Sequence, residues 1–133
     1  MKTIVILILF CTIGSITYCQ PNPNMKATST TSTEIIRYKV SEGEHEAFID
    51  AYTAASKYLQ ASKYCLGYEL IQGDEEPNNF IVVIYWTSKD DHLNGFRKSS
   101  EFGPFFNLVK PFYNSIAEMK HYNSNFKWKK EQE

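Results

Sequence analysis

Apolar and polar side chains alternate along several short segments of the 133-residue chain. Over 34–40, Ile36, Tyr38 and Val40 fall on one side of an extended backbone, and two basic residues fall on the other. A period of two residues is typical of a β-strand with one buried face. This pattern, together with the turn residues that separate the segments, predicts strands over 34–40, 65–72, 80–86 and 115–122.

A helical period follows the first of these strands. Ser41 and Glu44 have the spacing of a capping box, in which a serine hydroxyl and a glutamate three residues later satisfy free backbone amides. The helix that follows is expected to end near Ser62. Its apolar side chains recur at steps of three and four residues, which places them on one stripe; they are Phe48, Tyr52, Ala55 and Leu59.

The second helical segment is predicted to be interrupted. Ser88 and the aspartates after it mark the start of a helix that runs to about Lys98. A broken helix over 101–109 then brings several phenylalanines and a valine onto one side despite Pro104. We expect Pro111 to end it, because proline disrupts a helix interior.

The expected order of elements is therefore β-α-β-β-α-β. This order predicts an α+β, ferredoxin-like fold: a four-stranded antiparallel sheet with both helices on one face. The strand at 80–86 nevertheless carries bulky apolar residues on both faces, whereas a half-solvated sheet alternates with polar residues. The second face needs a cover, and the sheet of an identical chain is the simplest one. We predict a homodimer that forms through the sheet face.

The N-terminus has a different pattern. An uninterrupted apolar run, Ile4–Cys11, follows Lys2. A core of about ten residues is shorter than a membrane span of roughly 20 and suits a signal peptide. We predict a signal peptide over 1–19, cleavage before Gln20, and an exported protein, periplasmic or secreted, without a membrane span. An uncleaved anchor stays open; a lipoprotein lipidated at Cys19 is less favoured because Tyr18 is bulky.

Residues 20–33 are rich in proline, asparagine, serine and threonine and predict a flexible linker before the domain at 34–122. The polar tail at 123–133 either frays or pairs as an extra strand. After signal cleavage only Cys65 remains, so no internal disulfide is possible. Its position in an apolar strand predicts a buried, unreactive thiol.

Composition excludes several functional classes. The chain is 43% hydrophobic, 15% aromatic and 22% charged, which is too apolar for a disordered protein. A formal net charge of −1 provides no basic surface for nucleic acid.

Several motifs resemble the antibiotic biosynthesis monooxygenase (ABM) domain. The resemblance covers about residues 34–122, and its motifs are CLGYEL at 65–70, EPNNF at 76–80, YWTSKDDHL at 85–93, SSEF at 99–102 and Tyr122. The family implies a dimeric α/β barrel. Characterised members oxidise phenolic compounds to quinones with O2 and without metal or flavin, because an electron-rich phenolate can itself reduce oxygen. Others degrade haem, process small signalling molecules or have no established activity.

The carry-over of family residues is incomplete. Trp86 matches the tryptophan of the third strand. Where the quinone-forming branch has a pocket asparagine and a tyrosine, this chain has Val82 and His92. Where the haem-degrading branch has an asparagine and a histidine, it has Ile36 and Phe96, so the resemblance does not imply haem degradation.

We take His92 as the candidate general base, because imidazole titrates near neutral pH; the neighbouring aspartates leave a solvent-facing position as the alternative. Trp86 is the second catalytic candidate; it is either a core residue that also lines the pocket or a participant in the chemistry. Arg97 either holds an anionic substrate or is solvated. His45 is expected at the surface and His121 towards the dimer side, and this scatter predicts no metal site. The remaining candidate pocket residues are Tyr52, Tyr68, Tyr85, Phe48 and Phe96.

These residues predict a monooxygenase that needs no cofactor and oxidises a small aromatic, quinol-like substrate with O2. The alternative is an exported dimer that binds a small molecule or serves in stress without catalysis, having lost the polar pocket residues.

Overall fold

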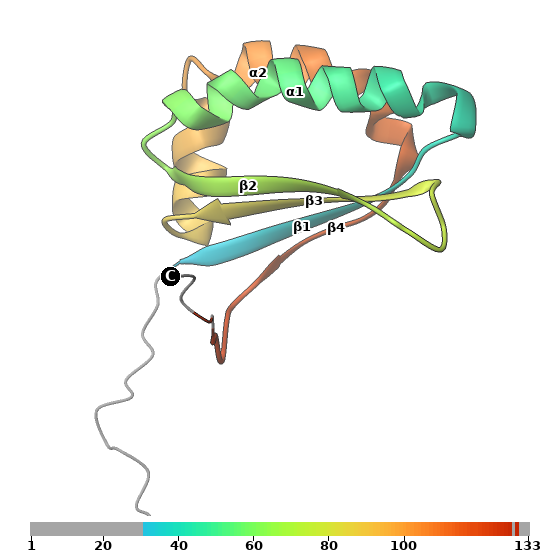
Figure 1. The fold of residues 1–133 in the computed structure, drawn as a ribbon. Helices are drawn as coiled ribbons and strands as arrows, with labels where there is room; N and C mark the ends of the chain where they lie inside the picture. The colour runs from blue at the N-terminus through green and yellow to red at the C-terminus, as the bar shows by residue number, and fades with distance from the viewer. Residues whose placement is uncertain (1–30, 129, 131–133) are drawn as a thin grey trace, which may run out of the picture.

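A computed structural model describes residues 31–128 and 130. Four antiparallel strands form one sheet in the order β2-β3-β1-β4. Helices α1 and α2 both lie on one face of this sheet (Figure 1). The strands are β1 (Ser32–Lys39), β2 (Cys65–Gln72), β3 (Asn79–Trp86) and β4 (Ile116–Tyr122), and the α-helices are α1 (His45–Ala61) and α2 (Phe102–Val109). The predicted α+β, ferredoxin-like fold is confirmed; the sheet of the single chain is open.

The predicted strands lie within two residues of the observed ones. β2 has the expected bounds, whereas β1 begins at Ser32, inside the segment expected to be a linker. The predicted signal peptide and the other linker residues, up to residue 30, lie outside the described residues.

The first helix buries the expected stripe of Phe48, Tyr52, Ala55 and Leu59. The capping box is not formed, because the Ser41 side chain makes no cap hydrogen bond. Its backbone carbonyl instead accepts from the Glu44 amide at 2.8 Å, within a short 3₁₀ turn, η1 (Glu42–Glu44). The helix start is thus held by the backbone.

The second helical region is divided into four pieces. A π-helical turn, η2 (Asp91–Gly95), is followed by a 3₁₀ turn, η3 (Phe96–Lys98), then by α2 and by a 3₁₀ segment, η4 (Lys110–Ser115). The predicted start is confirmed, since the Ser88 hydroxyl accepts from the Asp91 amide at 3.0 Å. The α-helix ends at Val109, just before Pro111, as predicted. The chain then continues as the 3₁₀ segment η4, and Pro111 lies in its first turn, where proline is tolerated.

The two faces of the sheet differ in cover. On β3, Phe80, Val82, Ile84 and Trp86 face the helices and are buried. The side chains between them, Ile81, Val83 and Tyr85, point to the open face and are partly exposed.

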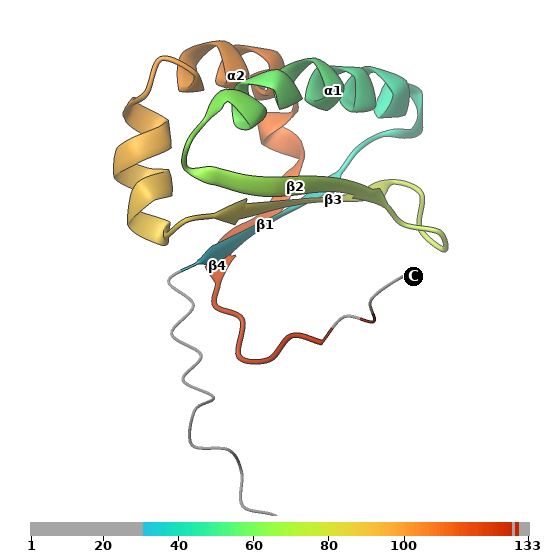
Figure 2. The same ribbon diagram turned by 60° about the vertical axis from the view of Figure 1, so that its left-hand side comes forward.

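The described part of the C-terminal tail turns back below the open face (Figure 2). It forms no strand over 123–128 or at 130, and Lys127 Nζ lies 5.7 Å from the centre of the Tyr85 ring. Phe126 and Trp128 remain largely exposed. The tail therefore does not seal this face.

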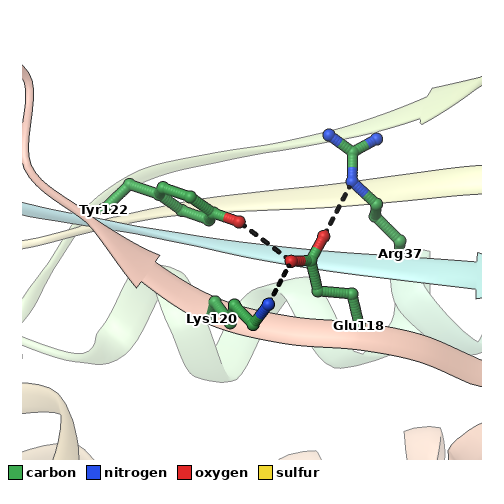
Figure 3. A network of polar contacts seen from close by, with 4 residues as sticks. All are labelled: Arg37, Glu118, Lys120 and Tyr122. Atoms are coloured by element: carbon green, nitrogen blue, oxygen red, sulfur yellow. Dashed lines mark hydrogen bonds and ion pairs between the residues drawn. The ribbon is translucent and has the colours of Figure 1, made fainter.

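A polar network lies on the same open face, at β1 and β4 (Figure 3). Glu118 accepts from Arg37 Nε at 3.1 Å, from Lys120 Nζ at 2.9 Å and from the Tyr122 hydroxyl at 3.0 Å. These contacts hold the pKa of Glu118 below its usual value. The open face is thus apolar at β3 and charged at β4.

Within the described residues, no helix combines the length and the apolar character that crossing a bilayer requires.

Candidate functional site

Four polar or aromatic side chains meet at one end of the helix-covered face. Glu34 and His121 are paired across β1 and β4, and this register puts both side chains on the same side of the sheet. Trp86 is the last residue of β3, and His92 comes from the π-helical turn that follows. A strand register and a helical turn together assemble groups that lie far apart in the sequence.

His92 is buried, with only 5% of its surface exposed, so the solvent-facing alternative is wrong. Its ring stacks on Trp86 with the centres 4.4 Å apart and the planes 5° from parallel. The turn that carries it is held at its start by the Ser88 cap. At its end, a Cβ on Gly95 would lie 2.6 Å from the Tyr64 ring, so glycine permits this close packing.

Hydrogen bonds link the four side chains. Trp86 Nε1–H donates to Glu34 Oε2 at 3.0 Å. His92 Nδ1 and His121 Nε2 are 2.8 Å apart, so one of these nitrogens carries the proton and donates to the other. The same His92 Nδ1 lies 3.6 Å from Glu34 Oε2.

Burial sets the charge state of the cluster. It raises the pKa of Glu34 to about 7, against the lowering effects of the Trp86 hydrogen bond and the Arg97 charge. Burial, together with the smaller effects of His121 and Arg97, lowers the pKa of His92 to about 3. The pKa of His121 is also below its usual value, chiefly through burial and then through Lys89 and Arg97. The contact of Glu34 with His92 is therefore not an ion pair at neutral pH, although the distance would suit one.

An aromatic-lined cavity lies next to this cluster. Glu34, Trp86 and His92 form one wall, and Tyr38 and Tyr52 form another. The two tyrosine hydroxyls are hydrogen-bonded to each other at 2.6 Å. Burial raises the pKa of Tyr38 to about 12 and that of Tyr52 well above its usual value, so both hydroxyls stay protonated.

Aromatic side chains also form the outer wall of the cavity. Phe102 and Phe106 stack with centres 5.6 Å apart, and Tyr113 packs edge-on against Phe106 at 6.1 Å. The Arg97 guanidinium lies 5.8 Å from the centre of the Phe102 ring, and Arg97 as a residue is exposed. The free volume is only about 40 Å³. That is room for a water molecule or an ion, whereas pockets for organic ligands typically measure about 300–1,000 Å³.

Five of the eight candidate residues line this cavity: His92, Trp86, Tyr52, Phe96 and Arg97. The other three do not. Phe48 is fully buried among Tyr38, Phe80 and Phe112. The Tyr68 hydroxyl accepts from Gln60 on α1, and Tyr85 lies on the open face with its hydroxyl donating to Glu69.

Three other expectations change. His121 faces the helices and His92, not the predicted dimer side. Cys65 is half-buried rather than buried, and burial raises its pKa. His45 is partly buried rather than fully at the surface. Its Nε2 lies within hydrogen-bond distance of the Val40 carbonyl and the Asn78 side chain.

Sequence reasoning missed Glu34, Tyr38 and His121 as site residues. Glu34 has the same strand parity as Ile36 and Tyr38, so a carboxylate on the apolar face was visible in the alternation. A charged group on a buried face is a signal for a functional site. The pairing with His121 was not visible, because it depends on the strand register.

The family model of antibiotic biosynthesis monooxygenases matches residues 31–108. Among curated proteins, the chain is 28% identical over 83 residues to the uncharacterized protein YczJ of Bacillus subtilis strain 168. That match covers 62% of this chain and 87% of YczJ.

Solved structures share the fold. A protein of Bordetella bronchiseptica, provisionally assigned to the antibiotic biosynthesis monooxygenases, has a TM-score of 0.61 and 24% identity over 72% of this chain and 98% of its own. SnoaB, a cofactor-independent oxygenase of Streptomyces nogalater, has a TM-score of 0.58 and 13% identity over 73% of this chain and 95% of its own. At these identities the similarity concerns the fold alone.

Proposed function

Because the chain belongs to the antibiotic biosynthesis monooxygenase family, we propose that it is an oxygenase that oxidises a small, electron-rich aromatic substrate of quinol type with O2 and without a cofactor. The observation that carries this proposal is the buried His92 imidazole, stacked on Trp86 and next to Glu34 at the wall of an aromatic-lined cavity.

The chemistry requires a phenol that loses its proton and then reduces O2. The phenolate gives one electron to O2, and the resulting radicals combine to form a carbon–oxygen bond. Loss of water from the peroxide then leaves a quinone, so one phenol and one O2 yield one quinone and one water. The protein has to bind the phenol, accept its proton and exclude bulk water.

The residues of the cavity suit these tasks. Glu34 is the stronger base of the two polar groups, because burial raises its pKa to about 7, so its carboxylate accepts the phenolic proton. The neutral His92 imidazole accepts a hydrogen bond from the substrate. Tyr38 and Tyr52 stay protonated, so their hydroxyls donate to an oxygen of the substrate. Exposed Arg97 at the outer wall attracts an anionic group on the substrate.

Substrate entry requires the cavity to enlarge, because an aromatic ring does not fit the present 40 Å³. The outer wall is open to solvent in part, since Phe102 and Phe106 are partly exposed and Tyr113 is exposed. Outward movement of α2 and η4 would open the cavity without breaking the sheet.

A panel of hydroquinones and anthrone-like phenols tests the proposal. Incubation with and without O2 should show oxygen uptake and quinone absorbance only aerobically. Glu34→Gln should lower turnover by about 100-fold or more, the contribution typical of a general base, and His92→Ala should lower it by less. His45→Ala is the control, since His45 lies outside the cavity. Absence of an oxygen-dependent product with every substrate, or full activity in His92→Ala, would contradict the proposal.

The loss of a polar pocket residue supports the second candidate, a binding protein without catalysis. Val82 replaces the pocket asparagine expected from the resemblance and is buried among apolar side chains. A member of this kind would bind the aromatic compounds of the same panel in calorimetry, with unchanged affinity in His92→Ala and no product.

We also propose that the protein forms a homodimer through the open sheet face. Ile81, Val83 and Tyr85 leave an apolar strip there that no described residue of the chain seals. Light scattering should give the mass of two chains at micromolar concentration; a stable monomer would refute the dimer.

Export is the remaining part of the proposal. The supporting feature is the apolar run Ile4–Cys11, which lies outside the described residues. Mass spectrometry of the mature protein should find Gln20 at the N-terminus. An intact Met1 in the cytoplasm, or a lipid on Cys19, would contradict it.

A further inference from the structure

The cluster of Glu34, His92 and His121 brings three possible metal-ligand side chains together, which the proposed proton transfer does not require. Each side chain offers a possible metal-ligand atom, and these atoms all lie within 4.8 Å of one another. Two of the separations are 2.8 Å, between the histidine nitrogens, and 3.6 Å, between His92 Nδ1 and Glu34 Oε2. A first-row metal ion lies about 2.0–2.2 Å from nitrogen and oxygen ligands, which places the ligand atoms roughly 3.0–3.6 Å apart. The other separations lie within 4.8 Å, so side-chain rotation has to bring the three atoms closer around a common ion.

We propose that Glu34, His92 and His121 bind a divalent first-row transition metal ion. Two imidazoles and one carboxylate are typical ligands of Zn²⁺ and Fe²⁺, and three protein ligands leave coordination positions open. Ca²⁺ and Mg²⁺ prefer all-oxygen sites and do not fit this set.

The surroundings support a site of this kind. Trp86 Nε1–H donates to Glu34 and so orients the carboxylate, as hydrogen-bond donors around metal sites orient the ligands. The stacking of Trp86 on His92 fixes the imidazole plane. The adjacent cavity of about 40 Å³ has room for a water ligand of the ion, although it excludes an aromatic molecule.

One nearby charge opposes the ion. Arg97 lies close enough to affect the electrostatics of all three ligands, and its positive charge repels a cation. We therefore expect Arg97→Gln to tighten metal binding.

The metal site does not depend on the proposed oxidation, but it would regulate it. A bound ion uses the lone pairs with which Glu34 would accept the substrate proton and His92 would accept a hydrogen bond from the substrate. Metal binding and cofactor-free oxidation thus compete for the same atoms, and the ion acts as an inhibitor.

Titration of the purified protein with Co²⁺ is the direct test. We expect visible d–d absorption bands, saturation at one ion per chain, and displacement by Zn²⁺ but not by Mg²⁺ or Ca²⁺. Removing a ligand in Glu34→Gln or His121→Gln should weaken binding by more than about 100-fold. Trp86→Phe removes only the hydrogen bond to a ligand and should weaken it by about 10–100-fold. Both variants should fold. The glutamine of Glu34→Gln still accepts the hydrogen bond from Trp86, and His121 is half-exposed, so its replacement leaves no buried cavity. Circular dichroism checks the fold of both.

Matched controls are His45→Ala and Glu118→Gln, which remove a histidine and a glutamate from other places and should leave Co²⁺ binding unchanged. Absence of binding at millimolar Co²⁺, or equal binding in the wild type, Glu34→Gln and His121→Gln, would overturn the metal site. Treatment with a chelator distinguishes the two proposals. Faster oxidation after the metal is removed would support competition between metal binding and oxidation. Oxidation that requires the metal would overturn the cofactor-free function and the inhibition while leaving the site intact.

Discussion

The two faces of the sheet carry the same kinds of side chain but have different surroundings. Trp86 and Tyr85 are neighbours on β3, and both are aromatic with a polar atom. Trp86 is fully buried, stacks on His92 and donates to Glu34. Tyr85 lies on the open face, where its hydroxyl donates to Glu69 and Lys127 lies near its ring.

The difference shows what the cover of a sheet contributes. Under α1 and α2, burial shifts the pKa values of Glu34 and His92 far from their usual values. The shifted groups form a cluster that is suited to take part in a reaction. On the open face, the charges of Arg37, Glu118 and Lys120 remain solvated and pair with one another. The covered face is suited to chemistry, and the open face to association.

The largest expected effect comes from comparing the two β3 aromatics directly. Trp86→Ala should lower the free energy of unfolding by about 3–5 kcal/mol, because it empties a fully buried position. Tyr85→Ala should cost less than about 1 kcal/mol in the monomer, since its ring is partly exposed. Urea unfolding at low protein concentration measures both. Equal losses would mean that the open face is as well packed as the covered one.

The second prediction concerns association through the open face. Val83→Lys places a charge in the centre of the apolar strip and should convert the proposed dimer to a monomer, because a buried unpaired charge is costly. Glu69, opposite Val83 across β2 and β3, can pair with the new lysine in the monomer. Light scattering measures the mass, and circular dichroism checks the fold. A folded Val83→Lys dimer would exclude this face as the interface.

A smaller effect is expected at the polar network on β4. Glu118→Gln removes the charge that Arg37 and Lys120 share, but solvent screening makes such exposed pairs weak. The melting temperature should fall slightly at low salt and match the wild type at high salt. A large, salt-independent loss would indicate that Glu118 is desolvated, for example inside a dimer.

The smallest expected effect is kinetic and concerns Cys65 at the end of β2. Because burial raises its pKa, less thiolate is present than for a free cysteine at the same pH. Alkylation by iodoacetamide at about pH 8, followed by mass spectrometry of the Cys65 peptide, should be slower in the folded protein than in urea. Equal rates would show that the packing at this edge does not protect the thiol.

Local patterns were sufficient for the elements. The alternation around Ile36 and the stripe that includes Phe48 and Leu59 depend on neighbours in sequence, so strands and the first helix were predicted within about two residues. The prediction failed where two local interactions compete for the same backbone amide. At Ser41 the backbone carbonyl, and not the hydroxyl, accepts the hydrogen bond at the start of the helix.

The candidate site was predicted only in part. His92 and Trp86 lie six residues apart on consecutive elements, and their proximity followed from local order. Tyr68 and Tyr85 were misplaced because the choice of pocket residues among many aromatics depends on which end of the sheet the cavity occupies.

By itself, the sequence determined the order of elements, the ferredoxin-like fold class and the presence of an apolar strand with two faces, because these follow from side-chain periodicity. The tertiary structure alone decided that Glu34 and His121 meet His92. Glu34 and His121 are far apart along the chain, and only the antiparallel register of β1 and β4 sets them opposite each other. Their burial beneath the helices then sets their protonation, since desolvation acts through the surroundings and not through sequence neighbours.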